Sequence, residues 1–260
     1  MPQSLTDKVA LVTGSARRVG KAIALALAAE GANLVIHYYG SDADIAQDTV
    51  REAKSFGVDA VSFRADQADP PQVDHLFEAV QERFGRLDIL VNSASIFERA
   101  DFLNLSYAAW QRVLAVNLTG PFLCSQAAAR RMLGQTPPGG VIVNIIDNSA
   151  FQPWPQFPHH GVSKAGLWML TQIMARALAP HIRVNAVAPG PVLKEPNRSD
   201  ESWARLAERL PLQRTGSPED VARAVLFLVR EPFITGVVLH VDGGEALTDS
   251  GAADKPRAGG

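Results

Sequence analysis

The sequence has a single cysteine, Cys124, among its 260 residues. One cysteine excludes an internal disulfide and any metal site built from several thiolates, so we expect a reducing compartment and a cytoplasmic protein. The histidines show no metal-ligand spacing, so no metal site is predicted. Excess charge of one sign is also lacking: the net charge of -2 predicts neither a nucleic-acid partner nor binding to a membrane surface.

Long apolar runs are missing as well. No stretch approaches the ~20 apolar residues that a membrane-spanning helix needs. Internal repeats and linkers are absent before residue 247, so we predict one domain over residues 1–247. Residues 248–260 are small and polar, and we expect them to form a flexible tail.

What the sequence does contain is an alternation of short apolar runs with amphipathic segments. It predicts seven strands, at 9–13, 33–37, 60–64, 88–92, 141–146, 182–187 and 237–241. Helices are expected at 19–30, 45–56, 72–84, 108–132, 163–178 and 218–229, with a short one at 201–210 inside a lid-like segment at 191–214. Several strands are apolar throughout, which is typical of a parallel sheet covered on both faces. The predicted fold is α/β: one Rossmann-type, doubly wound, seven-stranded parallel sheet with helices on both faces.

The turn after the first predicted strand reads TGSARRVG at positions 13–20. Glycine at Gly14 and Gly20 permits close backbone approach, and the helix that follows offers unpaired N–H groups to an anion. We therefore predict a dinucleotide phosphate site here. Two glycines are a weaker signal than the three-glycine fingerprint, so an ordinary strand-to-helix turn is the alternative.

The second predicted strand ends in HYYGS at 37–41, without the Asp or Glu that binds the ribose hydroxyls in NAD enzymes. A 2′-phosphate would meet no repulsion there. Arg17 and Ser41 can supply charge and donors to that phosphate, with His37 as a further candidate. The sequence thus favours NADPH over NAD, although Arg17 and Arg18 could also form a solvated helix start.

From about Lys8 to Gly244, the sequence resembles the short-chain dehydrogenase/reductase family. The resemblance rests on motifs that occur in the family's order: the 13–20 turn, Asp66, NSAS at 92–95, Asn117, Lys164, PG at 189–190 and VDGG at 241–244. It implies that Asp66 contacts the adenine and that Lys164 holds the nicotinamide ribose. The cofactor-binding residues implied by the turn and the resemblance together are Gly14, Arg17, Arg18, Val19, Gly20, His37, Tyr38, Ser41, Asp66, Gln67, Asn92, Ala94, Asn117, Lys164, Pro189 and Gly190.

Within the family the sequence is most similar to the pteridine reductases. Their glycine-rich turn carries an arginine at the position of Arg18, and their substrate loop matches at Ser95 and Phe97. Asp147 stands where most of the family has a serine, and pteridine reductases also carry Asp there. The resemblance implies a flat, polar heterocycle as the substrate, bound by Arg18, Ser95, Phe97, Asp147 and His160.

One position departs from the family. The acid of the family is the tyrosine of a Tyr-x-x-x-Lys pair, and here the residue four before Lys164 is His160. Asp147 precedes His160 by 13 residues, the spacing by which the family brings its Ser or Asp beside the tyrosine. We therefore expect an Asp147–His160 pair in which an imidazole, with a free pKa of ~6.5, acts as the acid. His159 is expected in a loop before the helix.

These features predict an NADPH-dependent reductase of a pterin-like substrate such as a dihydropteridine or dihydrofolate, with Asp147, His160 and Lys164 as its catalytic residues. A 3-oxoacyl or other carbonyl reductase is the first alternative. A non-catalytic NADPH-binding protein, which has lost turnover with the tyrosine, is the second. As in most of the family, we expect a homo-tetramer formed through the helices at 108–132 and 163–178.

Overall fold

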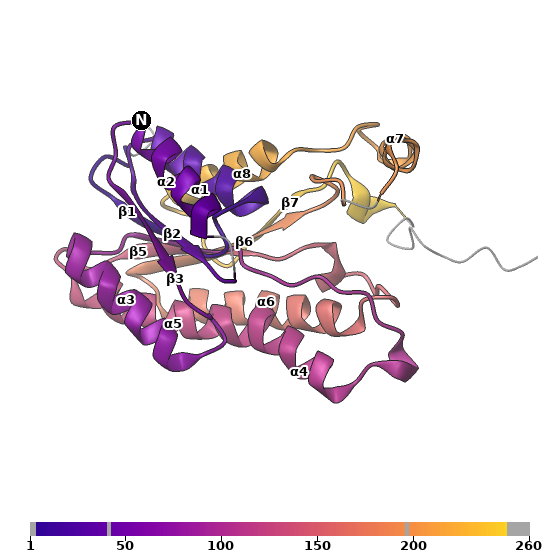
Figure 1. Cartoon of the computed structure of the whole chain (residues 1–260), viewed down its shortest axis with the longest axis horizontal. Helices are drawn as coiled ribbons and strands as arrows, with labels where there is room; N and C mark the ends of the chain where they lie inside the picture. The colour runs from indigo at the N-terminus through magenta and orange to yellow at the C-terminus, as the bar shows by residue number, and fades with distance from the viewer. Residues whose placement is uncertain (1–3, 41–42, 196–197, 249–260) are drawn as a thin grey trace, which may run out of the picture.

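The computed structural model of the chain describes residues 4–40, 43–195 and 198–248. Seven strands form one sheet in the order β3-β2-β1-β4-β5-β6-β7, and each neighbouring pair is parallel (Figure 1). The strands are β1 Val9–Val12, β2 Asn33–Tyr38, β3 Ala60–Arg64, β4 Ile89–Asn92, β5 Gly140–Ile145, β6 Ile182–Pro189 and β7 Val238–Val241. The predicted doubly wound, seven-stranded parallel sheet is confirmed.

Helices cover both faces of this sheet, as predicted. Figure 1 shows α1, α2 and α8 over one face and α3, α5 and α6 over the other. The helices are α1 Arg18–Ala29, α2 Ala43–Lys54, α3 Pro70–Phe84, α4 Tyr107–Leu114, α5 Gly120–Gly134, α6 Pro158–Ala177, α7 Asp200–Arg209 and α8 Pro218–Arg230. None of the helices within the described ranges is long and apolar enough to cross a bilayer.

The sheet is apolar because its central strands supply two cores at once. In β1, Ala10 and Val12 pack into the core beneath α1, α2 and α8, whereas Val9 and Leu11 pack into the core beneath α3, α5 and α6. Successive side chains of a strand point to opposite faces, so most positions of a doubly covered strand are apolar. This is why continuous apolar runs predicted the fold class.

Two helices differ from the prediction. The helix expected at 108–132 is divided into α4 and α5 by a π-helical turn, Ala115–Thr119. The helix expected at 163–178 begins five residues earlier, at Pro158, since proline is well tolerated in the first turn of a helix. The expectation that His159 lies in a loop is therefore wrong: it is helical and buried.

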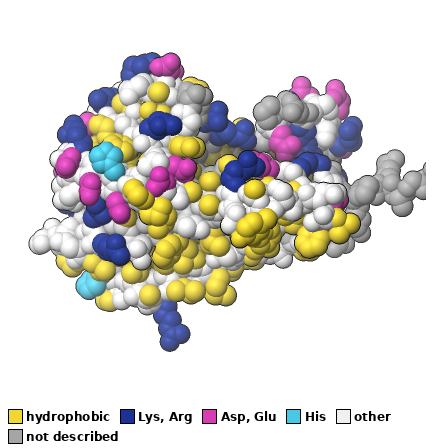
Figure 2. All heavy atoms as spheres, turned by 60° about the horizontal axis from the view of Figure 1, so that its bottom comes forward, with side chains coloured by type: hydrophobic (Ala, Val, Ile, Leu, Met, Phe, Trp, Pro, Cys, Tyr) yellow, Lys and Arg dark blue, Asp and Glu magenta, His cyan; other side chains and the backbone are white. Residues whose placement is uncertain are grey.

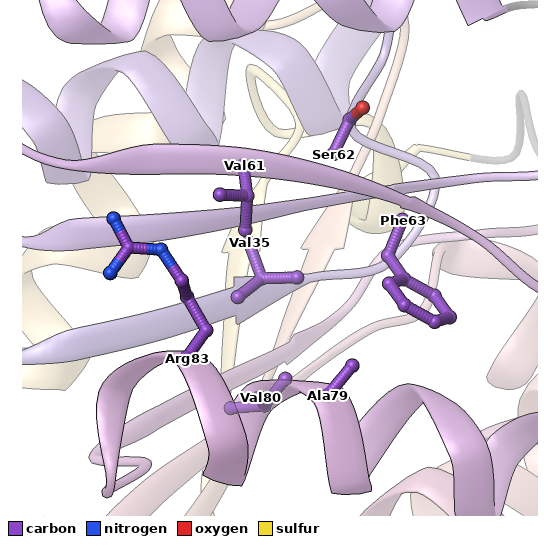
Figure 3. Close-up of a pocket in the computed structure, with 7 residues that line it drawn as sticks. All are labelled: Val35, Val61, Ser62, Phe63, Ala79, Val80 and Arg83. Atoms are coloured by element: carbon purple, nitrogen blue, oxygen red, sulfur yellow. The ribbon is translucent and has the colours of Figure 1, made fainter.

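A hollow on the outer part of the sheet lies apart from the predicted site. It is formed between β2, β3 and α3, where Val35, Val61 and Val80 provide apolar walls and Arg83 lies at one side (Figure 3). None of the predicted site residues lines this hollow. The predicted residues gather instead where the parallel strands end, at their shared carboxyl edge.

Candidate active site

The turn between β1 and α1 leaves no room for side chains on its glycines. A Cβ on Gly14 would lie 2.8 Å from the Ala94 Cα, and one on Gly20 would lie 2.4 Å from the Gly14 carbonyl oxygen. Gly14 also has a positive φ of 65°. Bare backbone at the start of a helix is the cradle that a pyrophosphate needs, so this turn fits the phosphates of a dinucleotide.

Arg18 opens α1 with a φ of 58°, in the left-handed region. A side chain in that conformation costs about 1–2 kcal/mol, so a position usually given to glycine holds an exposed cation here. The first turn of α1 contains no acidic residue, and Arg17 precedes it. Two arginines at a helix N-terminus oppose the helix dipole unless an anion binds between them and the backbone.

His37 is not available to a cofactor, which corrects the prediction. Its side chain is only 1% exposed, and both ring nitrogens are occupied. Nδ1 accepts the Gly14 N–H at 3.1 Å, which leaves Nε2 to donate to the Ala65 carbonyl at 2.9 Å. Burial lowers the pKa of His37 to about 4, against the opposing effects of the Ala65 hydrogen bond and the Asp66 charge. His37 is a neutral support for the phosphate turn, and Ser41 lies outside the described residues.

Some of the predicted cofactor residues are turned toward the interior. The Asn92 amide donates to Asn144 Oδ1 at 2.8 Å and to Ser125 Oγ at 3.0 Å. Gln67 Nε2 donates to the Val116 carbonyl at 2.8 Å. These two buried side chains hold the ends of β3 and β4 in place.

Other predicted positions form the edge at which a cofactor would lie. The Ala94 N–H is fixed by Thr13 Oγ1 at 3.0 Å, and Asp66 stays half-buried while its Oδ1 accepts the Ala68 N–H. Gly190, directly after Pro189 at the end of β6, has no space for a side chain, because a Cβ would lie 2.7 Å from the Asp242 Cα. Tyr38 ends β2 and Val19 lies in the first turn of α1, both half-buried.

The Asp147–His160 pair is present at the opposite end of the site. His160 lies in the first turn of α6, and its Nε2 is 2.6 Å from Asp147 Oδ2. The sequence spacing therefore predicted this contact correctly. Asp147 follows the end of β5, where its Oδ1 also accepts the N–H and the hydroxyl of Ser149. Two elements thus fix the carboxylate from different sides.

The second ring nitrogen of His160 lies between an acceptor and a donor. Nδ1 is 3.3 Å from the Ile96 carbonyl oxygen and 3.3 Å from the Asn117 amide nitrogen. Asn117, from the π-helical turn, itself bonds both main-chain groups of Ile96 at 2.9 Å. A neutral imidazole can accept from Asn117, whereas an imidazolium can donate to Ile96. Both protonation states of His160 are accommodated without a change of position.

Lys164 lies one turn after His160 on α6. Its ammonium is buried and donates to the Ile145 carbonyl at 2.9 Å. Burial lowers the pKa of Lys164, and Asp147 opposes that effect. For Asp147, burial acts to raise the pKa, but the His160 hydrogen bond and the positive charges of His160 and Lys164 together outweigh it. The pKa of Asp147 is therefore below its usual value, and the group is a carboxylate near neutral pH.

Three aromatic side chains, Phe97, Phe157 and Trp154, form an aromatic wall beside this pair. The Phe97 ring stacks on Phe157 with centroids 4.2 Å apart, and it is nearly perpendicular to the His160 ring at 4.7 Å. Trp154 completes the cluster, 6.3 Å from Phe97. Phe97 remains 45% exposed, so it offers surface to a ligand, and Ser95 is exposed nearby. The sequence identified Phe97 but not Phe157, because the helix was predicted to begin at 163 and Phe157 lies directly before its observed start at Pro158.

A family model described as enoyl-(acyl carrier protein) reductase matches residues 14–245. Among the similar proteins, the 3-oxoacyl-[acyl-carrier-protein] reductase of Synechocystis sp. is 38% identical, over 94% of this chain and 99% of its own length. The 3beta-hydroxysteroid dehydrogenase 1 of Eggerthella lenta is 39% identical, over 95% of this chain and 97% of its own length. These relatives are named for different substrates and provide no support specific to pterins.

Solved structures agree with the architecture. A blue fluorescent protein from a metagenomic library, solved in complex with NADPH, has a TM-score of 0.86 and 35% identity, covering 93% of this chain and 99% of that one. The acetoin dehydrogenase YohF of Salmonella typhimurium has a TM-score of 0.85 and 37% identity, over 93% and 97% of the two chains. By motif order, fold and similarity along nearly its whole length, the chain belongs to the short-chain dehydrogenase/reductase family of oxidoreductases.

Proposed function

We propose that this oxidoreductase is an NADPH-dependent reductase of a flat, conjugated heterocycle such as a dihydropteridine or dihydrofolate. The observation that carries the proposal is the Asp147–His160 contact of 2.6 Å beside the exposed face of Phe97. Phe97 and Ser95 would hold the heterocycle, with Arg18 at the phosphate turn. The nicotinamide, when bound, supplies a hydride, and the protein must supply the means to handle a proton.

The preference for NADPH rests on the ends of β1 and β2. Asp and Glu are absent from the HYYGS segment at 37–41, so no carboxylate there opposes a 2′-phosphate. Arg17 and Arg18 place two cations at the start of α1, beside the glycine cradle. One similar protein of known structure was solved with NADPH. A lower Kd for NADPH than for NADH would test this preference directly.

The roles of the buried polar residues follow from their contacts. His160 Nε2 and Asp147 Oδ2 form a hydrogen bond, and the Asn117 amide contacts the other ring nitrogen of His160. Lys164, with its ammonium buried near Asp147, would bind the nicotinamide ribose. This arrangement keeps a hydrogen-bonding imidazole at the position of the missing tyrosine.

Two alternatives have support of their own. A 3-oxoacyl or other carbonyl reductase is favoured by the names of the relatives. A protein that binds NADPH without turnover is favoured by the replacement of the family tyrosine by His160.

The deciding experiment measures NADPH oxidation by the purified protein with dihydrobiopterin, dihydrofolate and a 3-oxoacyl thioester, alongside a cofactor titration. Turnover of a pterin but not of the thioester supports the proposal, and the reverse preference supports a carbonyl reductase. NADPH binding without turnover, with turnover gained in His160→Tyr, identifies a chain that kept the pocket and lost the chemistry.

We also propose that the chain forms a homo-tetramer through α5 and α6. Figure 2 shows hydrophobic side chains gathered over the face that carries α4, α5 and α6. On α6, Val162, Met169 and Ile173 are all at least half exposed and lie at helical spacing, with Phe122 exposed on α5. Light scattering of the protein and of an Ile173→Lys variant tests the interface, because a buried lysine there should dissociate it.

A further inference from the structure

The group that a substrate can reach is Asp147 rather than His160. The side chain of His160 is 2% exposed and lies against Phe97, whereas the side chain of Asp147 keeps 18% exposure. The carboxylate of Asp147 is therefore more open to solvent than the imidazole of His160. A heteroatom of the substrate would touch Asp147, and His160 would act on it only through Asp147.

The hydrogen bonds of Asp147 leave one position open. A carboxylate has about four acceptor positions, two on each oxygen. Oδ1 accepts both the N–H and the hydroxyl of Ser149, and Oδ2 accepts Nε2–H of His160. The remaining lone pair on Oδ2 can accept one more hydrogen. The site is thus built to receive a donor from the substrate, and a neutral carbonyl oxygen carries none.

The surroundings of Asp147 are rich in carboxyl groups. Next to it in sequence, Asn148 Nδ2 donates to Asp242 Oδ2 at 3.0 Å and to Glu245 Oε2 at 2.9 Å. Burial raises the pKa of Glu245; the Asn148 hydrogen bond opposes this rise, while the charges of Asp242 and Asp147 add to it. The negative charges of Asp147 and Asp242 thus repel that of Glu245, and a cation bound at Asp147 would offset this repulsion, as Lys164 offsets the charge of Asp147 itself.

The aromatic wall is suited to a cation as well. Phe97 stacks on Phe157, and Trp154 lies beside both rings, so a flat ligand that reaches Asp147 would lie against aromatic carbon. Aromatic faces attract cations in addition to burying apolar area. The charge of Asp147, its open acceptor position and the flat aromatic surface therefore all favour a flat cationic ligand that carries an N–H group.

We infer that the reducible group of the substrate is a C=N bond that binds as a cationic iminium, with its N–H donated to Asp147 Oδ2. This inference rests on the proposed reductase and narrows its substrate class. Hydride from the reduced nicotinamide forms a C–H bond at the iminium carbon while the C=N π electrons become the lone pair of nitrogen. The nitrogen keeps its proton, the cation becomes a neutral amine, and no proton has to be transferred in the same step. His160 is then a positioning residue that holds Asp147 in place.

The first test compares two bicyclic substrates of similar shape, 3,4-dihydroisoquinoline as the imine and 1-tetralone as the ketone, by NADPH oxidation. We expect kcat/KM for the imine to exceed that for the ketone by at least about 10-fold. Asp147→Asn should lower kcat/KM for the imine by about 100-fold, because the amide lacks the charge. Asp48→Asn, which changes an exposed carboxylate on α2, is the matched control and should have no effect.

The second test measures binding without turnover, by calorimetry in the presence of NADP⁺. The ligands are protonated 1,2,3,4-tetrahydroisoquinoline and the neutral alcohol 1-tetralol. We expect the cation to bind at least about 10-fold tighter, and Asp147→Asn to remove the difference. Asp147→Ser is a second variant, checked with the first by thermal unfolding, since Asp147 also caps the turn at Asn148–Ala150.

The outcomes separate the inference from the proposed function. Reduction of the ketone in preference to the imine, with cation binding unchanged in both Asp147 variants, overturns the inference and leaves the reductase intact. Cation binding that depends on Asp147, without NADPH oxidation on any substrate, supports the cation site and removes the reductase. If neither Asp147-dependent cation binding nor NADPH oxidation is observed, both the inference and the proposed reductase are overturned.

Discussion

Two histidines of this protein are buried to the same extent but have different hydrogen-bond partners and different roles. His37, in β2, is 1% exposed, and His160, at the start of α6, is 2% exposed. His37 lies between two main-chain groups, the Gly14 N–H and the Ala65 carbonyl. His160 lies against a carboxylate, that of Asp147. Burial alone therefore does not decide what a histidine does; the charge of its partner does.

The same contrast separates the two halves of the site. The turn at the phosphate end is held by backbone contacts and by a neutral imidazole, with Arg17 and Arg18 exposed beside it, so its geometry is set by packing and by uncharged hydrogen bonds. The catalytic end contains Asp147, Lys164 and His160, whose contacts stabilise or oppose each other's charges. We expect substitutions at the first end to change stability and cofactor affinity, and substitutions at the second to change turnover.

The largest expected effect tests His160 at the catalytic end of the site. His160→Ala should lower kcat/KM by about 10²-fold, because the residue that holds Asp147 in place is lost. The Kd for NADPH should stay within about 2-fold, since His160 makes no contact with the phosphate turn in the described part of the chain. Stopped-flow NADPH oxidation and a fluorescence titration measure the two quantities.

Two further variants make that result specific. His75→Ala changes an exposed histidine on α3 and should leave both quantities unchanged. His160→Gln retains an N–H that can reach Asp147, so it should recover part of the loss if His160 positions the carboxylate. Wild-type turnover in His160→Ala would show that the two histidines are both merely structural.

The second prediction concerns His37, which should make the free energy of unfolding depend on pH. Its pKa is about 4 in the folded chain and ~6.5 in the unfolded chain, so below pH 6.5 the unfolded chain binds a proton that the folded one does not. The stabilisation is complete above pH 6.5 and is lost as the pH falls toward 4, by about 1.4 kcal/mol per pH unit and on the order of 3 kcal/mol in all.

Urea unfolding of the wild type and of His37→Gln at pH 7 and pH 4.5 measures this loss. Glutamine cannot take up the proton, so the variant should lose less stability between the two pH values, by about 2–3 kcal/mol. Other acidic groups titrate in both proteins and cancel in the comparison. If the free energy of unfolding falls equally in the two proteins, protonation of His37 in the folded chain does not reduce stability, and the prediction is wrong.

The smallest expected effect concerns the backbone of the phosphate turn. Arg18→Gly relieves the positive φ of 58° and should stabilise the fold by up to about 1 kcal/mol. It should also weaken NADPH binding, because it removes a cation at the start of α1. Arg17→Gly is the control, since the φ of Arg17 is −154° and glycine relieves nothing there. Equal thermal shifts in both variants would contradict this account of strain.

Much of the fold could be predicted because it depends on local patterns. The limits predicted for β3 are those observed, and all seven strands were found from runs of apolar residues. The Asp147–His160 contact could be predicted because the family brings two positions 13 residues apart together at this site. The start of α6 could not, because Pro158 and the prolines before it also suit a loop.

The missed features depend on residues far apart in sequence. His37 was named as a candidate for the cofactor because an imidazole at the end of this strand can supply charge and a donor to a 2′-phosphate. Its actual partners are the Gly14 N–H, 23 residues earlier, and the Ala65 carbonyl, and only tertiary packing shows that the ring points inward. Phe157 meets Phe97 across 60 residues for the same reason. The π-helical turn was missed because one extra residue hardly alters the apolar periodicity.

That π-helical turn gives the chain an unusual weak point. A π turn is an α-helix with one residue too many, so deletion of a single residue from Ala115–Thr119 could let α4 and α5 join as one regular helix. The flanking turns of α4 and α5 would keep their faces, because the extra residue is held as a local bulge. Asn117 would leave its place beside His160 while helix content stayed the same. Loss of this local bulge would thus separate the Asn117 amide from the imidazole of His160.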